Sequence, residues 1–172
     1  QSHFNKVLSY IESGVSDGAR VVCGGQPAEV AGCEGGFYIQ PTVLADVTND
    51  MKVAREEIFG PVLSVIKYSS EEEAIELAND TIYGLSAGVW TADLVRAQQI
   101  ARRLQAGSIW INDWHMIRTD APFGGFKQSG YGRELGANSI DSYVETKAVS
   151  MSFERAPEKK VMHRLVHTQL GQ

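Results

Sequence analysis

Residues 56–61 read EEIFGP, so two carboxylates stand directly before an aromatic ring and a Gly-Pro turn. A carboxylate can accept two hydrogen bonds from a ribose diol, and an aromatic ring can pack against a flat base or a nicotinamide. The other interpretation is a solvated pair of glutamates beside a core phenylalanine. The residue types alone favour neither interpretation, so the segment is a candidate nucleotide contact.

Residues 84–88 read GLSAG, which matches the G-x-S-x-G pattern of the nucleophile elbow in serine hydrolases. Such an elbow lies between the end of a strand and the start of a helix. Here Gly84 ends a helix and a strand follows, so a hydrolase that uses Ser86 is the least favoured alternative. The glycines of residues 130–136 do not match the dinucleotide fingerprint, because the third glycine is one position late and no strand precedes them.

Metal and thiol chemistry find little support in the sequence. The four histidines lack the spacing of metal ligands, and neither C-x-x-C nor H-E-x-x-H occurs, so we predict no metal site. Cys23 and Cys33 have no histidine near them in the sequence to lower a thiol pKa. We therefore expect both to be small buried or loop residues, not nucleophiles.

The composition is that of a chain that can fold around a core. Its 172 residues are 43% hydrophobic and 22% charged, which corresponds to about one domain. The 16 Lys and Arg against 21 Asp and Glu give a formal net charge of −5, which argues against a general binder of nucleic acids. No apolar run is long enough to span a membrane, and two cysteines are too few for a disulfide scaffold. We expect a reduced, cytoplasmic setting.

The elements that must position these residues alternate between strand and helix. Between predicted helices lie apolar strands at residues 62–68, 85–91 and 108–112. Ser70 and Glu73 form a capping box at the start of the first intervening helix, and Asp93 can cap the second. Short connections in the order β-α-β-α-β predict an α/β fold with a parallel sheet, which binds ligands beyond the carboxyl ends of its strands. Asn112 and the glycine-rich connection at 113–138 stand at such an end.

The flanking sequence extends this pattern. Apolar residues at helical spacing begin at Phe4, so a helix is already under way at the first residue, which indicates a fragment of something longer. Residues 20–23 and 37–47 are predicted to be extended and joined by a Gly/Pro-rich hairpin connection. Alternating residues at 147–153 predict a further strand. The tail at 154–172 is predicted to be either a helix that docks on a partner or a disordered terminus.

Several of these segments resemble the aldehyde dehydrogenase superfamily, in the order that the family has them. The matching segments are EEIFGPVLSV (56–65), YGLSAGVWT (83–91), AGSIWIN (106–112) and APFGGFKQSGYGRELG (121–136). The resemblance covers residues 1–152, and it implies part of the α/β catalytic domain of that family together with a C-terminal oligomerisation strand.

The resemblance implies an NAD- or NADP-dependent oxidation of an aldehyde to a carboxylic acid. In the family, a cysteine thiolate attacks the aldehyde, hydride passes to the nicotinamide, and a glutamate-activated water releases the acid. The second glutamate of the EEIFGP block binds the nicotinamide ribose hydroxyls, and its phenylalanine packs by the nicotinamide. Cofactor binding is thereby assigned to Glu57 and Phe59.

The resemblance also implies a substrate channel. The phenylalanine of the PFGG block lines it in the family and corresponds to Phe123, and Ile117 falls in the same channel-lining stretch. Trp114 stands where betaine-aldehyde-type members have an aromatic residue that helps to surround a trimethylammonium group through cation–π attraction. Other members have other residues there, so Trp114 does not by itself identify the substrate.

The family's nucleophilic cysteine, oxyanion-holding asparagine, general-base glutamate and Rossmann-type domain all precede the part that resembles this chain. We therefore predict that the chain holds no catalytic residue and is an inactive part of a homo-oligomeric enzyme, a dimer or tetramer. Three parts are expected: catalytic-domain sequence at 1–145, the oligomerisation strand at 146–153 and the tail at 154–172. The alternative is a non-catalytic interaction module that works alone through the strand at 147–153.

Overall fold

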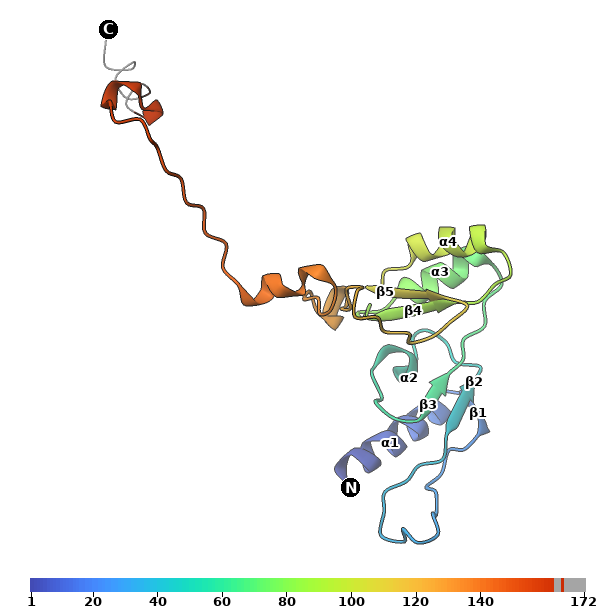
Figure 1. Ribbon diagram of the computed structural model, residues 1–172. Helices are drawn as coiled ribbons and strands as arrows, with labels where there is room; N and C mark the ends of the chain where they lie inside the picture. The colour runs from blue at the N-terminus through green and yellow to red at the C-terminus, as the bar shows by residue number, and fades with distance from the viewer. Residues whose placement is uncertain (163–164, 166–172) are drawn as a thin grey trace. The chain divides into compact units, whose positions relative to one another are not determined.

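The computed structural model describes residues 1–162 and 165 (Figure 1). The chain divides into two compact units, Gln1–Ser139 and Ile140–Gln172. The sheets and the α-helices that accompany them lie in the first unit. Among the described residues, no helix combines the length and the apolar character that crossing a membrane requires.

The first sheet has three strands in the order β1-β2-β3. β1 (Arg20–Cys23) and β2 (Thr42–Ala45) are antiparallel, as the predicted hairpin requires, and β2 runs parallel to β3 (Val62–Ser64). Burial alternates along β2, where Thr42 and Leu44 are almost completely buried. The sheet therefore has one face in the core.

Helix α1 (Ser2–Ser16) packs against this sheet, and its buried side chains follow the helical spacing that the sequence predicts. The buried cluster consists of Val7, Tyr10, Ile11, Ala19, Leu44, Val47, Val53 and Ile58. A Cβ atom on Gly14 would lie 3.1 Å from Leu44 Cδ1. The missing side chain of Gly14 thus allows the helix to approach β2 closely.

The second sheet consists of two parallel strands, β4 (Ser86–Val89) and β5 (Ser108–Ile111). Helix α3 (Glu71–Asn79) precedes β4, and α4 (Leu94–Arg103) forms the crossover between the two strands. Figure 1 shows both helices on the same side of this sheet. The β-α-β unit predicted between residues 85 and 112 is therefore confirmed.

Both of these helices begin at the predicted caps. Ser70 Oγ accepts a hydrogen bond from the Glu73 backbone N–H at 3.2 Å, and Glu73 Oε2 accepts one from the Ser69 N–H at 2.6 Å. Asp93 Oδ1 accepts a hydrogen bond from the Arg96 N–H at 3.0 Å. Each bond satisfies a donor at or next to the first turn, where the helix ladder offers no acceptor.

Ion pairs connect the helices. Arg103 of α4 donates two hydrogen bonds to the Glu72 carboxylate on α3, and they hold the pKa of Glu72 below its ordinary value. Arg55 Nη2 lies 2.8 Å from Asp80 Oδ2 and links α2 (Lys52–Arg55) to the end of α3. The second pair links the segment between β2 and β3 to the end of a helix that lies beside the second sheet.

The prediction of one sheet through all three apolar strands was wrong for the described part of the chain. β3 pairs with β2, whereas β4 pairs with β5. The alternation of apolar residues indicates that a segment is a strand, but it does not indicate which strand lies beside it. The first of these strands is also shorter than expected and ends at Ser64. The class of the fold, α/β with parallel strand pairs, is nevertheless as predicted.

The second unit has little regular structure among its described residues. A 3-10 helix at Ala137–Tyr143 leads into it, and residues 144–156 form neither helix nor strand. The strand predicted at 147–153 is therefore not formed. A strand requires a neighbour for its backbone hydrogen bonds, and no described segment pairs with this one.

The predicted tail is described as far as residue 162 and again at residue 165. It contains a 3-10 helix at Pro157–Lys159, and Val161, Met162 and Leu165 of the expected helical stripe are exposed. Val166, which completes that stripe, lies outside the described residues.

Candidate functional site

The EEIFGP segment follows α2 directly, and its two carboxylates have different surroundings. Tyr10 Oη donates a hydrogen bond to Glu56 Oε2 at 2.7 Å, which raises the pKa of Tyr10 above its ordinary value. Glu57 is exposed, and its carboxylate has no hydrogen-bond or ion-pair partner among residues 1–162 and 165. Glu57 is therefore the member of the pair whose oxygens are available to a ligand.

Phe59 is not a core residue, because its side chain is 76% exposed while the neighbouring Ile58 is buried. Its φ of +55° is in the left-handed region, which is uncommon for a bulky residue. His3 Nε2 lies 2.7 Å from the Phe59 carbonyl oxygen. A Cβ atom on Gly60 would lie 2.7 Å from Val7 Cγ2, so only glycine fits against α1 there. The backbone is thus attached to α1 while the Phe59 ring extends into solvent.

The second group of predicted residues follows β5, where Asn112 reverses the chain. Asn112 has a φ of +56°, and its backbone N–H donates to the Val89 carbonyl at 2.8 Å. Its side-chain amide makes two more bonds to the backbone of Thr91: Oδ1 accepts from the N–H at 2.8 Å and Nδ2 donates to the carbonyl at 2.9 Å. Asn112 thus fixes the carboxyl ends of β4 and β5 to each other before the chain turns back.

Trp114 belongs to an aromatic cluster at this end of the sheet, made of Trp90, Trp110, Trp114 and His115. The centroid of the Trp114 ring system lies 5.3 Å from that of Trp110 in an edge-on arrangement and 6.3 Å from that of Trp90. His115 stacks on Trp110 at 6.0 Å. Trp90 and Trp114 remain more than half exposed, so the cluster presents indole surface to a ligand.

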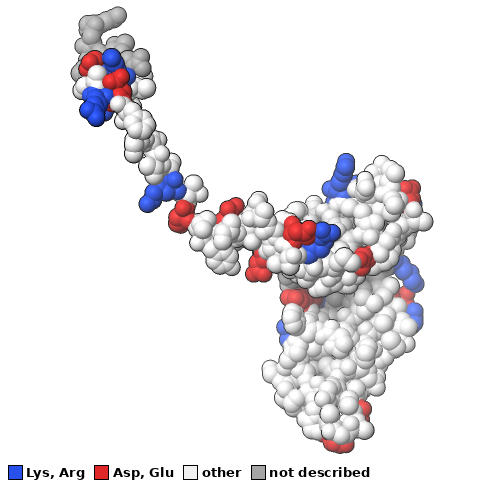
Figure 2. All heavy atoms as spheres, in the orientation of Figure 1, with Lys and Arg blue, Asp and Glu red and all other residues white. Residues whose placement is uncertain are grey.

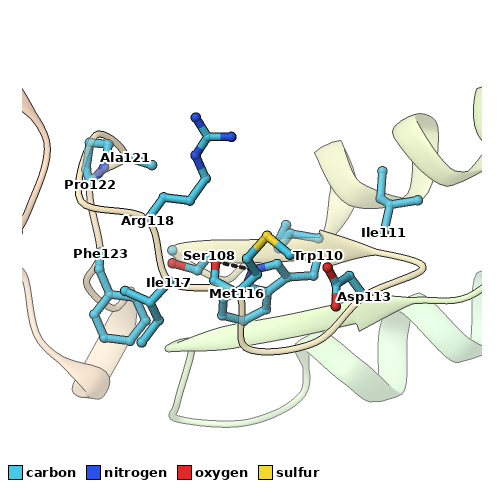
Figure 3. A pocket seen from close by; sticks show the side chains of 12 residues that line it. Ser108, Trp110, Ile111, Asp113, Met116, Ile117, Arg118, Ala121, Pro122 and Phe123 are labelled. Carbon is cyan, nitrogen blue, oxygen red and sulfur yellow. Dashed lines mark hydrogen bonds between the residues drawn. The ribbon is translucent and has the colours of Figure 1, made fainter.

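A groove of about 420 Å³ lies along β5 and the loop that follows it (Figure 3). Ile117 and Phe123, both predicted to line a substrate channel, are among its lining residues, and so is Trp110. Trp110 Nε1 donates a hydrogen bond to the Met116 carbonyl at 3.0 Å, which holds the loop against the strand. Trp114 does not line the groove, but its indole packs edge-on against that of Trp110, which does.

The backbone around Phe123 is held by two reciprocal hydrogen bonds with Glu134. The Phe123 N–H donates to the Glu134 carbonyl at 2.7 Å, and the reverse bond measures 2.8 Å. Gly107 and Gly124 lie so close together that a Cβ atom on Gly107 would collide with the Gly124 carbonyl. The PFGG block therefore packs directly against the start of β5, which places Phe123 in the groove.

The five predicted residues fall into two groups. Glu57 and Phe59 adjoin α1 and the first sheet, whereas Trp114, Ile117 and Phe123 belong to the loop after the second sheet. The groove along β5 is lined by Ile117 and Phe123 but not by Glu57 or Phe59. The sequence did not identify Trp90 or Trp110 as part of the site, although both stand at or near the carboxyl end of a predicted strand, where ligand contacts are expected.

The residues of the less favoured chemistries lie apart from both groups. Ser86 begins β4, so it lacks the strand-to-helix turn of a nucleophile elbow. Cys23 and Cys33 are both exposed; for Cys23, which lies on β1, the expectation of a buried or loop position was wrong. No group of His, Cys, Asp or Glu within the described ranges could hold a metal ion. On the face shown in Figure 2, positive and negative side chains are interspersed.

Comparison with known proteins identifies relatives of nearly the whole described chain. The model of the aldehyde dehydrogenase family matches residues 1–149. Betaine aldehyde dehydrogenase of Bacillus subtilis is 48% identical over 147 residues, which are 86% of this chain and 30% of that protein.

Two solved structures have the same local fold. The aldehyde dehydrogenase KauB from Pseudomonas aeruginosa is 52% identical with a TM-score of 0.83, and the match covers 87% of this chain and 30% of that one. A mutant of the indole-3-acetaldehyde dehydrogenase AldA of P. syringae, solved in complex with NAD+ and IAA, is 51% identical with a TM-score of 0.81 over 86% of this chain and 29% of that one.

The chain thus spans about 30% of the length of the curated relatives that it matches. The matched residues include both groups of predicted site residues. The chain belongs to the aldehyde dehydrogenase family.

Proposed function

We propose that this chain is the C-terminal part of an NAD-dependent aldehyde dehydrogenase, an enzyme that oxidises an aldehyde to a carboxylic acid. The observation that carries the proposal is the family match over residues 1–149. Within this match, the side chains of Glu57 and Phe59 are exposed and lie outside the buried core. The full-length enzyme of which the chain would be a part is called the parent enzyme below.

The described residues fit a nicotinamide cofactor. The Glu57 carboxylate can accept hydrogen bonds from a ribose diol, because Glu56 and not Glu57 is engaged by Tyr10. The exposed Phe59 ring offers a flat apolar surface whose backbone is held against α1. NAD supplies the acceptor for the hydride that the aldehyde loses, and Glu57 and Phe59 bind and orient its nicotinamide end. NAD is proposed in preference to NADP because the P. syringae relative was solved with NAD+.

Ile117 and Phe123 form the apolar wall of the aldehyde channel in this proposal, and Trp114 stands at its aromatic cluster. An aldehyde with a trimethylammonium group would gain cation–π attraction from the exposed indoles. Betaine aldehyde is the proposed substrate, supported by the relative from B. subtilis. The relative named for indole-3-acetaldehyde has comparable identity, so the choice rests on the three indoles.

The nucleophile and the general base are proposed to come from parts of the parent enzyme outside this chain. Cys23 Sγ lies 3.8 Å from the Pro41 carbonyl, with no histidine or lysine hydrogen-bonded to it among the described residues. The contacts of Cys23 among the described residues thus include no base that could take up the thiol proton, as attack on an aldehyde requires. The chain alone is therefore expected to be inactive.

Self-association through residues 147–153 is part of the same proposal. Val149, Met151 and Phe153 alternate along this segment and are 75–89% exposed, and no described strand pairs with its backbone. An extended segment with one apolar side and free backbone groups gains both hydrogen bonds and burial when it pairs with a second chain. We propose a homo-oligomeric parent enzyme in which this segment becomes a strand.

The activity is tested by following the absorbance of reduced nicotinamide in the parent enzyme. Betaine aldehyde and its uncharged isostere, tert-butylacetaldehyde, are compared with NAD+ and with NADP+. We expect NAD+ reduction with a kcat/KM for betaine aldehyde about tenfold above that for the isostere, which corresponds to a cation–π contribution. Absence of reduction with either aldehyde and either cofactor would refute the proposed activity.

A further inference from the structure

The indoles of Trp90 and Trp114 meet over a glycine of β4. A Cβ atom on Gly88 would lie 2.5 Å from Trp90 Cζ3 and 3.0 Å from Trp114 Cε3. Real Cβ atoms do not approach ring carbons to 2.5 Å, so both indoles occupy space that any larger residue would take. The ring pair in its present position therefore depends on glycine at residue 88.

The backbone explains why these side chains converge on Gly88. Trp90 follows Gly88 by two residues, so it projects from the same side of the strand, and Trp110 is the register partner of Gly88 on β5. Trp114 comes from the loop, which Asn112 turns back over the sheet through its bonds to Thr91. Trp90, which directly follows β4, and Trp114 of the loop thus meet at the missing side chain of Gly88, and Trp110 of β5 stands at the paired position.

We propose that Gly88 and Trp90 position the Trp114 indole and thereby set the selectivity of the enzyme for cationic over neutral aldehydes. This inference rests on the proposed function, since that proposal assigns the attraction of the cation to the exposed indoles, of which Trp114 is one. The Trp90 ring lies beside the half-exposed Trp114 ring and restricts the orientations that the Trp114 side chain can adopt. A ring that is already held in position loses less conformational entropy when the ligand binds. More of its attraction to the cation therefore contributes to the binding affinity.

The structure also indicates how the arrangement can be disturbed without unfolding the chain. The atom closest to a Cβ on Gly88 is a far ring carbon of Trp90, whose side chain is 62% exposed and can move outward. Gly88→Ala should therefore separate the indole pair while the strands remain paired. Gly35→Ala is the matched control, because nothing lies within 4 Å of a Cβ at that loop glycine.

The experiment measures two quantities in the parent enzyme for each variant. The first is the ratio of kcat/KM for betaine aldehyde to that for tert-butylacetaldehyde, and the second is the circular dichroism of the coupled indoles. Gly88→Ala and Trp90→Leu are expected to lower the ratio about fivefold and to remove the coupled signal. Trp90→Phe should retain most of the selectivity, and Gly35→Ala should change neither quantity.

The outcomes separate this inference from the proposed function. An unchanged ratio in Trp90→Leu, or a coupled-indole signal that persists in Gly88→Ala, would overturn the inference even if the parent enzyme is active. If the unaltered enzyme oxidises neither aldehyde, the proposed function fails. The circular dichroism of Gly88→Ala then still decides whether Gly88 positions the indole pair.

Discussion

Glu56 and Glu57 are adjacent residues for which we propose separate tasks. Both residues are exposed, but the Glu56 carboxylate accepts a hydrogen bond from Tyr10, a residue of the buried cluster, whereas the Glu57 carboxylate has no hydrogen-bond partner among the described residues. A hydrogen bond inside the fold contributes to stability, and a free carboxylate beside an exposed aromatic ring contributes to binding. Substitutions of the two residues can therefore be compared to separate an effect on cofactor binding from an effect on the fold.

Glu57→Gln in the parent enzyme is expected to lower kcat/KM for NAD+ about tenfold, because a charge-assisted hydrogen bond to the ribose becomes a neutral one. The KM for the aldehyde should stay unchanged, since Glu57 lies away from the channel residues. Steady-state kinetics with each substrate varied in turn measures both values. Unchanged kinetics with NAD+ would contradict the assignment of Glu57 to the cofactor.

Glu56→Gln is the matched control for this substitution. It should leave the kinetics with NAD+ unaltered and move the pKa of Tyr10 back toward its ordinary value of 10.0, because the carboxylate bonded to the phenol is what raises it. An absorbance titration of the tyrosines measures that change.

The resemblance to the family blocks predicted five site residues: Glu57, Phe59, Trp114, Ile117 and Phe123. It did not predict that the Phe59 backbone adopts a positive φ, since this depends on the contacts of the segment with α1. The position of the Trp114 indole could not be predicted from the sequence either, because it depends on the pairing of β4 with β5 and on the turn at Asn112. Contacts between segments distant in the sequence determine both features.

At the scale of elements, the three-stranded sheet depends on one buried face. Leu44 of β2 is completely buried, while Leu63, on the neighbouring strand β3, is 59% exposed. Burial of a leucine stabilises a fold only where water is excluded from it. Two leucines on adjacent strands of the same sheet should therefore differ strongly in their contribution to stability.

Leu44→Ala is expected to lower the free energy of unfolding of the chain by about 2–5 kcal/mol, because it removes buried methyl groups and leaves a cavity. Leu63→Ala, which removes the same atoms from an exposed position, should cost less than about 1 kcal/mol. Urea denaturation monitored by circular dichroism compares the two. Equal losses in both variants would contradict the placement of the core on one face of the sheet.

Helix starts were predictable at this scale and sheet partners were not. The caps at Ser70 and Asp93 are local, since each side chain bonds to a residue three positions ahead. The pairing of β3 with β2 brings together residues about 20 positions apart and competes with other apolar strands. The sequence pattern predicts which segments form strands, but it does not predict which strands pair with each other.

At the level of the whole molecule, the proposed function gives the chain binding residues and assigns the groups that perform the chemistry to the rest of the parent enzyme. Glu57 and Phe59 offer contacts for a cofactor, and the groove with Ile117 and Phe123 offers contacts for a substrate. The extended segment at 147–153 adds a surface whose apolar side chains are exposed. These features are accounted for if the chain acts as one part of a larger, self-associating enzyme.

Met151→Lys in the parent enzyme is expected to reduce the oligomer to smaller species, because it places a charge among the alternating apolar residues of that segment. Ser150→Lys, one position away and on the opposite side of an extended chain, should leave the mass unchanged. Light scattering coupled to size-exclusion chromatography measures the mass of each variant. An identical mass for Met151→Lys and the unaltered enzyme would refute pairing through residues 147–153.

A comparison of NAD+ reduction by the parent enzyme and by the 172-residue chain alone, with betaine aldehyde at the same protein concentration, tests most directly whether the chain is a binding part of a larger enzyme. We expect sustained turnover by the parent enzyme and none by the chain, whose proposed roles are to bind and orient but not to attack the aldehyde. Sustained turnover by the chain alone would refute this proposal, and so would a parent enzyme that reduces no NAD+ with any aldehyde.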